Sequence, residues 1–257
     1  MIGAIRHCTC KGLSFVVSQK SSLDDYYVVS YEFVKKLFFG ITQRAVVFGN
    51  NKYGFVDYPF LYRERQLDSL ILPELAELCK GIAFAEYPVI RDSKKKTNEI
   101  SNSRGRVDYW CIYKDYSFVI EIKHSYDCFD NDYTRESRLA SRWRYMNIQQ
   151  LDDITKYLKG FCEKTKGIIR IALHFITSWS KTELDLESVN SIRTKEKSVL
   201  NRIANEFSSV KSRYTTPDFV GFWELMDEKI VMDDYVVPGL ILISKFYEPI
   251  RHYGSKS

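Results

Sequence analysis

Three charged side chains near the middle of the chain have the types and spacing that phosphodiester chemistry requires. Asp108 opens an apolar segment that ends at Tyr113, and Glu121 and Lys123 close a second apolar segment that begins at Tyr116. Carboxylates bind hard divalent cations such as Mg²⁺, and an ammonium group stabilises negative charge on a phosphate. Together the three residues could support metal-assisted hydrolysis of a phosphodiester bond.

The two apolar segments are predicted to form a β-hairpin whose turn sets the register. If Lys114 and Asp115 form the turn, antiparallel pairing places Asp108 opposite Glu121, with Lys123 on the diagonal. Directly opposed residues have Cβ atoms about 4.5–5.5 Å apart, so the two carboxylates would repel unless a cation lay between them. The pairs that this register predicts nearer the turn are Tyr113–Tyr116 and Trp110–Val119.

The pattern Asp108…Glu121-Ile122-Lys123 resembles the catalytic motif of the PD-(D/E)XK nuclease superfamily, which includes many restriction endonucleases. Valine at position 107 stands where the proline of the family name would be. The resemblance implies that Asp108 and Glu121 bind Mg²⁺ or Mn²⁺, with the Ile122 carbonyl as a third ligand. It implies that Lys123 orients or activates the attacking water and stabilises charge on the phosphate.

The resemblance also rests on the order of the elements expected around the motif. That family runs helix, strand, strand with the Asp, strand with Glu-x-Lys, helix, strand. Besides the hairpin, the sequence predicts a helix over 63–78, a strand over Ile82–Ile90, a helix over Asn147–Phe161 and a strand over Ile168–Ile176. The implied fold class is α/β, a central mixed β-sheet flanked by helices, with a restriction-endonuclease-like core and N- and C-terminal additions.

Two further side chains are candidates because many members of the family carry an equivalent. An acid on the first helix could join the metal ligands, and Glu64 is our candidate, with Glu74 just after Pro73 as the alternative. A glutamine on the helix after the motif is found in one branch of the family. Gln150 is our candidate catalytic residue for that role, and Gln149 is the alternative.

The regions outside the core are less regular in their patterns. We divide the chain into an N-terminal extension (1–60), the nuclease-like core (61–180) and a C-terminal helix and strands (181–257) of the same globular unit. The elements expected in the two additions are strands at Leu13–Ser18, Ala45–Phe48, Phe219–Leu225 and Leu240–Phe246, and a helix near Tyr31–Phe39.

Composition indicates a globular protein with a substantial core. The chain has 257 residues, of which 45% are hydrophobic and 15% aromatic, enough for one large domain. No apolar run approaches the roughly 18–20 residues of a membrane span, and Met1–Lys20 lacks the apolar stretch of a signal peptide. We therefore expect a cytoplasmic protein without a membrane partner.

Basic residues flank the motif on both sides. The net charge of +5 permits nucleic-acid binding without requiring it, so the distribution of charge says more than the sum. Lys94–Lys96 precede the first hairpin strand. Four arginines, interleaved with aromatic residues, follow the second: Arg135, Arg138, Arg142 and Arg144, among Tyr133, Trp143 and Tyr145. We expect these segments to line a phosphate-binding channel.

These patterns together predict a metal-dependent nuclease that hydrolyses DNA, with RNA as a second possible substrate. Roles in restriction, phage defence or mobile elements are expectations from the family alone. A homodimer would supply the two active sites that double-strand cutting often needs. The alternative is a nucleic-acid-binding module, or a partner-dependent subunit, that keeps the fold without cutting.

Overall fold

A computed structural model describes most of the chain. The described residues are 4–10, 13–19, 24–49, 57–92, 102–128, 136–151, 154, 164–180, 216–225, 230–232 and 235–250. Several predicted features lie outside the described residues: Lys94–Lys96, Tyr133, Arg135 and the part of the predicted helix beyond Ile154. The side chains of Arg138 and Gln149 also lie outside the description.

The described strands form one nine-stranded sheet in the order β1-β2-β7-β9-β6-β5-β4-β3, with β8 also paired to β9. Their bounds are β1 Ala4–Cys10, β2 Leu13–Gln19, β3 Ala83–Asp92, β4 Asn102–Tyr113, β5 Tyr116–Cys128, β6 Ile168–Ser180, β7 Phe219–Glu224, β8 Ile230–Met232 and β9 Tyr235–Phe246. Among these pairs β5 and β6 run parallel, and the others run antiparallel. The predicted mixed sheet is therefore confirmed, and strands from all three predicted regions share it.

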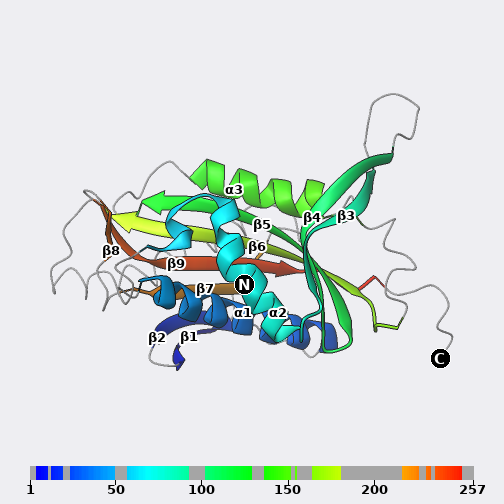
Figure 1. The fold of residues 1–257 in the computed structure, drawn as a ribbon, viewed down its shortest axis with the longest axis horizontal. Helices are drawn as coiled ribbons and strands as arrows, with labels where there is room; N and C mark the ends of the chain where they lie inside the picture. The colour runs from blue at the N-terminus through cyan, green and yellow to red at the C-terminus, as the bar shows by residue number, and fades with distance from the viewer. Residues whose placement is uncertain are drawn as a thin grey trace.

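Helices flank this sheet, as predicted. The longer ones are α1 Asp25–Gly49, α2 Asp68–Leu78 and α3 Glu136–Arg144. Three short turns of helix are η2 Pro59–Leu61, η3 Glu64–Leu67 and the π-helical η4 Tyr145–Gln150. In Figure 1, α2 crosses in front of the strands, α1 runs along the lower part of the sheet and α3 runs along the top. Within the described part, no helix is both long enough and apolar enough to span a membrane.

Two apolar clusters fill the spaces on the two faces of the sheet. Phe33 and Phe38 of α1 and Leu70 of α2 pack with Phe118 and Ile120 of β5. On the opposite face, Leu139 and Trp143 of α3 pack with Val119 of β5 and Ile176 of β6. Because side chains alternate along a strand, β5 contributes even-numbered residues to the first cluster and odd-numbered residues to the second. The site residues on β5 are divided between the same two faces.

The structure corrects two predicted elements. The apolar run Ala45–Phe48, predicted as a strand, is the last part of α1, because the helix predicted near Tyr31–Phe39 extends from Asp25 to Gly49. The helix predicted from Asn147 begins eleven residues earlier, at Glu136, and passes into the π-helical turn. The helix predicted over 63–78 begins as the short turn η3 and continues as α2, which contains Pro73.

Candidate active site

The β4–β5 hairpin has the predicted turn. Lys114 and Asp115 have φ angles of 44° and 65°, the left-handed values that a tight two-residue hairpin turn of this type requires at both positions. The pairs Tyr113–Tyr116 and Trp110–Val119 are confirmed. The pairing ends at Tyr109–Ile120, although β5 continues to Cys128 along β6. The predicted pair Asp108–Glu121 therefore lies one step beyond the observed ladder.

The β4 backbone is irregular at Asp108. Val107 and Trp110 pack in the same core cluster although they are three residues apart, so the alternation of faces is interrupted between them. On the neighbouring strand, Glu86 has a φ of 53° and is passed over in the β3–β4 pairing. Positive φ is uncommon for a residue other than glycine, and such backbone is concentrated at functional sites.

Asp108 points toward β5, whereas regular alternation along β4 would place it on the same face as Trp110. Its Oδ2 accepts a hydrogen bond of 2.7 Å from the Ile122 amide. The carboxylate thus takes the place that a β4 carbonyl would have in a continued ladder. In Figure 1 the β3–β4 ribbon bends away from the rest of the sheet toward the upper right. We call the opening between β4 and β5 beyond Tyr109–Ile120 the fork.

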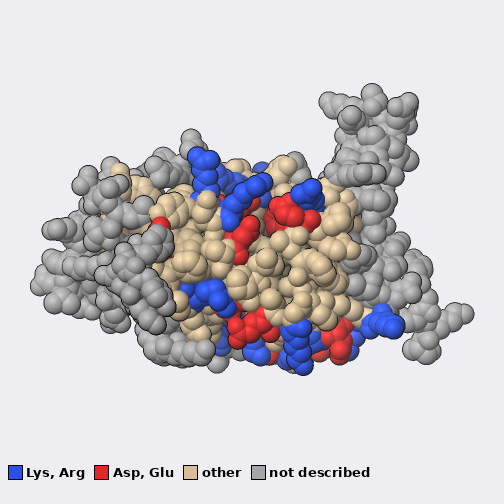
Figure 2. Space-filling view, in the orientation of Figure 1, with Lys and Arg blue, Asp and Glu red and all other residues tan. Residues whose placement is uncertain are grey.

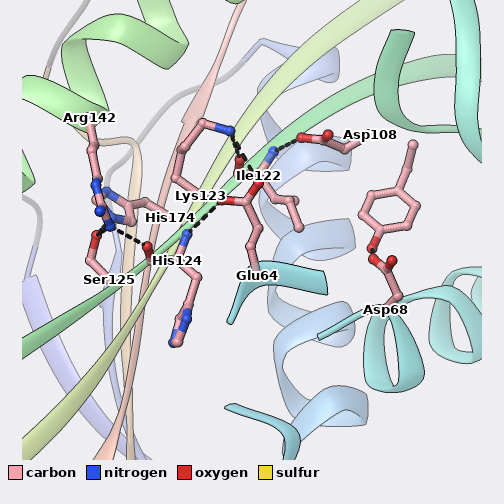
Figure 3. Close-up of polar contacts among 10 residues, drawn as sticks. Glu64, Asp68, Asp108, Ile122, Lys123, His124, Ser125, Arg142 and His174 are labelled. Carbon is pink, nitrogen blue, oxygen red and sulfur yellow. Dashed lines mark hydrogen bonds and ion pairs between the residues drawn. The ribbon is translucent and has the colours of Figure 1, made fainter. Parts of the chain in front are cut away.

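Glu64 and Lys123 meet at this fork. Glu64 Oε2 accepts a hydrogen bond of 3.2 Å from the His124 amide, and its Oε1 lies 3.4 Å from Lys123 Nζ. Lys123 Nζ also donates to the Ile122 carbonyl oxygen at 2.7 Å. Figure 3 shows these groups converging from η3, β4 and β5. The Lys123 side chain is 19% exposed and that of Glu64 37%, so both can be reached from solvent.

Glu121 lies deeper than the other acids. It is 1% exposed and belongs to the odd-numbered face of β5, which α3 covers. A buried carboxylate is costly unless polar or cationic groups compensate it. Among the described residues, no three His, Cys, Asp or Glu side chains stand at metal-binding spacing. The oxygen ligands predicted from the sequence are therefore near the same part of β5 without forming a closed ligand set.

The structure distinguishes between the two candidate helix acids by position. Glu64 lies at the fork, at the start of η3. Glu74 is directed at α1, where Oε1 accepts a hydrogen bond of 2.8 Å from Arg44 Nε. A Cβ on Gly40 would collide with the Glu74 carboxylate, which shows how closely the two helices approach.

Gln150 is half-buried at the end of η4, on the helix that covers the Glu121 face of β5. Its neighbour Gln149 has no described side chain.

A network that the sequence did not indicate fixes the segment leading to Glu64. Thr177 Oγ1 donates to the Phe60 carbonyl at 2.5 Å, and His124 Nε2 lies 2.9 Å from the same hydroxyl. Because the single hydroxyl proton is used on Phe60, His124 Nε2 must be the donor to Thr177. The single hydroxyl proton of Tyr126 is shared between the carbonyls of Leu61 and Tyr62. Burial lowers the pKa of His124 to about 4, so the ring is neutral near pH 7.

A second network fixes the other face of the same β5 segment. Arg142 Nη1 donates to the His124 carbonyl at 2.7 Å and to Ser125 Oγ at 2.9 Å. His174 Nε2 lies 2.9 Å from Ser125 Oγ, and the Trp143 ring is stacked on His174. Complete burial lowers the pKa of His174 to about 3, with His124, Arg142 and Lys123 adding to the shift. The one signal for this network in the sequence is the pair of polar residues His124 and Ser125, directly after Lys123.

The start of α2 is tied to the fork by a further acid. The Tyr109 hydroxyl donates to the Asp68 carboxylate, joining β4 to the first turn of α2. Burial and this neighbouring carboxylate raise the pKa of Tyr109, so the hydroxyl keeps its proton. Because η3 leads directly into α2, the bond also limits the movement of Glu64 relative to β4.

The segment after β5 that was expected to line a phosphate-binding channel contains both exposed and buried residues. Arg142 and Arg144 are exposed on α3, and Tyr145 is 51% exposed beside them. Trp143, expected with them in a channel, is instead a core residue packed against the sheet. Figure 2 shows basic side chains beside acidic ones over the region between α3 and β4. This part of the surface can attract a phosphate backbone without being uniformly positive.

Comparisons of the chain with protein-family models, with curated proteins and with solved structures found no match. The fork combines the carboxylates of Asp108 and Glu64, the main-chain carbonyl of Ile122 and the ammonium group of Lys123. This set can hold a hard cation and stabilise a phosphate that carries developing negative charge.

Proposed function

We propose that the protein is a metal-dependent nuclease of the PD-(D/E)XK type that hydrolyses phosphodiester bonds in DNA. The observation that carries the proposal is the meeting of Glu64, Asp108, the Ile122 carbonyl and Lys123 at the fork. The order of elements supports it, because α2, β3, β4, β5, α3 and β6 follow one another as helix, three strands, helix and strand.

The groups at the fork fit a hard divalent cation by their chemistry. The Ile122 carbonyl oxygen and Glu64 Oε1 both face the Lys123 ammonium, so this position is already lined with oxygens that attract positive charge. Mg²⁺ typically takes one or two carboxylates and keeps several waters, so it does not need a cage made only of protein atoms. Asp108, Glu121, Glu64 and the Ile122 carbonyl would be the groups that hold Mg²⁺ or Mn²⁺.

Each residue has a distinct role in the proposed hydrolysis. The bound cation would supply Lewis acidity and hold the phosphate in place. Lys123 would stabilise the negative charge that develops on the phosphate oxygens and would orient the attacking water. Gln150, if it reaches the fork from η4, would add a hydrogen bond to that water. The hydrogen bonds to the β5 backbone would hold the Ile122 carbonyl in place while the Lys123 side chain turns from Glu64 to the phosphate.

The first test is cleavage of plasmid and single-stranded DNA by the full chain with Mg²⁺, Mn²⁺ or EDTA. We expect cleavage only with a divalent cation, and a loss of at least about a hundredfold in Glu121→Ala and Lys123→Ala. Lys114→Met and Asp115→Asn are matched controls, because they remove the same charges from the exposed turn of the same hairpin.

The outcomes separate this function from its alternative. Cutting that persists in Glu121→Ala and Lys123→Ala would exclude the fork as the active site. DNA binding without any cutting would favour a non-cleaving module or a subunit that needs a partner. A parallel assay with RNA would decide whether the enzyme distinguishes deoxyribose from ribose in the substrate backbone. Roles in restriction, phage defence or mobile elements, and a cytoplasmic location, remain parts of the proposal.

A further inference from the structure

An aromatic cluster stands beside the fork on β3 and β4. The ring centroids of Phe84 and Trp110 are 5.6 Å apart, those of Tyr87 and Trp110 are 5.4 Å apart, and those of Phe84 and Tyr87 are 6.2 Å apart. Trp110 is buried beneath the others, and its Nε1 donates to Ser117 Oγ at 2.8 Å. Phe84 is 54% exposed, and Ile82 beside it is 44% exposed. We call Phe84, Tyr87 and Trp110 the aromatic platform.

The platform is next to the candidate site and on a defined side of the sheet. Phe84 pairs in register with Trp110, which is two residues along β4 from Asp108. Two residues along a strand span about 6.6–6.8 Å, so the rings lie within one or two nucleotides of the fork. Tyr87 and Trp110 belong to the core cluster of Leu139 and Trp143, which places the platform on the α3 side.

Basic side chains lie on β4, next to the strand that carries the exposed Phe84 ring, and on α3. The side chain of Arg106 on β4 is 69% exposed, and its Nη1 lies 3.3 Å from Glu86 Oε2. Glu86 stands between Phe84 and Tyr87 along β3. The exposed Arg142 and Arg144 are on α3, on the same side of the sheet. Exposed aromatic rings next to basic side chains are the combination with which proteins hold single-stranded nucleic acid.

We propose that Phe84 and Tyr87 stack against an unpaired base of the DNA strand whose phosphate enters the fork. The substrate class is therefore single-stranded DNA, or an unpaired segment within DNA. This inference rests on the proposed nuclease function. A paired duplex keeps the faces of its bases stacked on one another, so it has no free base face to offer Phe84. Stacking is tolerant of sequence because every base has a π-face.

A second copy of this chain is the other occupant to consider. Among the described strands β3 ends the sheet, so a second copy could add a strand along its free edge. The platform rings belong to the face of the sheet and not to that edge, since Tyr87 and Trp110 pack toward the α3 side. An added strand would leave Phe84 uncovered.

Binding in EDTA tests the platform separately from cleavage. The full chain and its variants Phe84→Ala, Phe84→Leu and Phe84→Tyr are titrated onto a fluorescent single strand and onto the matched blunt duplex, at one fixed salt concentration. We expect Phe84→Ala and Phe84→Leu to weaken single-strand binding about tenfold, since stacking on one ring contributes roughly 1–3 kcal/mol. Phe84→Tyr should stay within about twofold of the wild type, and duplex binding should change less.

Several results would overturn the inference. One such result is wild-type affinity of Phe84→Leu for the single strand. Another is an equal loss of affinity for the single strand and for the duplex. A change confined to oligomeric state, measured by light scattering, would assign the ring to contact between copies. Metal-dependent cleavage without dependence on Phe84 would remove the platform and leave the nuclease. Single-strand binding that depends on Phe84 in a protein that does not cleave DNA would support the platform and exclude the nuclease function.

Discussion

At the scale of single residues, Lys123 has two incompatible uses for its ammonium group. In the structure it is held by the Ile122 carbonyl and Glu64, which are also groups that would hold a cation. In the proposed hydrolysis it must instead face the phosphate. Loading of the proposed site with a cation would therefore require Lys123 to release these oxygens, because a second positive charge in the same place is repelled.

Replacement of Lys123 should consequently separate binding from catalysis. We expect Lys123→Met to lose cleavage and yet to bind Mn²⁺ about tenfold more tightly, since one repelling charge is gone from the oxygen-lined position. Isothermal titration with Mn²⁺ measures the affinity, and Lys114→Met is the control. Equal Mn²⁺ affinities in wild type and Lys123→Met would show that the ammonium does not compete for these oxygens.

At the scale of elements, the hairpin turn decides where every β5 side chain lies. Lys114 and Asp115 both adopt left-handed backbone, which a residue with a Cβ occupies at a cost of about 1 kcal/mol. The turn keeps the register that brings Ile122 to Asp108, although neither turn residue contacts the fork. Stability and activity should therefore respond differently to changes at the turn.

Asp115→Gly should raise the free energy of unfolding by about 0.5–1 kcal/mol, because glycine adopts a φ of 65° without a steric penalty. Asp115→Val should lower it, since a β-branched residue is strained there. Urea unfolding with an unchanged m-value measures both. DNA cleavage by the glycine variant should equal that of the wild type. A lower unfolding midpoint for Asp115→Gly than for Asp115→Val would contradict this account of the turn.

The hairpin also marks how far the sequence could predict the site. Alternating apolar residues and a two-residue turn were sufficient for the strands, the turn and two pairs of the register. The irregular backbone at Asp108 and the positive φ of Glu86 on the neighbouring strand were not predictable, because Glu86 is not a glycine and no local pattern demands a positive φ there. The carboxylate was therefore expected opposite Glu121 and instead accepts a hydrogen bond from the Ile122 amide.

At the scale of the whole molecule, prediction failed where elements distant in sequence meet. Ala45–Phe48 resembles a strand locally, but it continues the buried face of α1 against the sheet. The hydroxyl of Thr177 reaches Phe60, 117 residues away, and no local pattern links them. Glu64 could be proposed from its place near a helix start, whereas the network that positions it depends on tertiary packing.

Buried His174 couples this packing to pH. Its pKa is about 3 in the folded chain and about 6.5 when unfolded. Between these values the unfolded state binds the proton and the folded state does not, so the free energy of unfolding falls as the pH is lowered from about 6.5 toward 3. The loss approaches 1.36 kcal/mol per pH unit within that window. His124, with a pKa of about 4, acts in the same direction.

His174→Gln should therefore show a shallower dependence of stability on pH below about 6.5 than the wild type. Urea unfolding followed by circular dichroism at pH 7.5, 6.0 and 5.0 gives the slopes. The variant should be less stable at pH 7.5, where Ser125 loses its imidazole partner. Parallel slopes in the two proteins would show that His174 is not the group that titrates.

At the fork, two β5 amides are protected from hydrogen exchange by side chains and not by a neighbouring strand. The hydrogens of Ile122 and His124 are covered by the carboxylates of Asp108 and Glu64 instead of by a neighbouring strand. A cation or phosphate that draws those carboxylates away would open both amides to deuterium, while Ile120, still inside the ladder, would keep its hydrogen. The exchange of these two backbone positions with solvent would thus report whether the proposed site is filled.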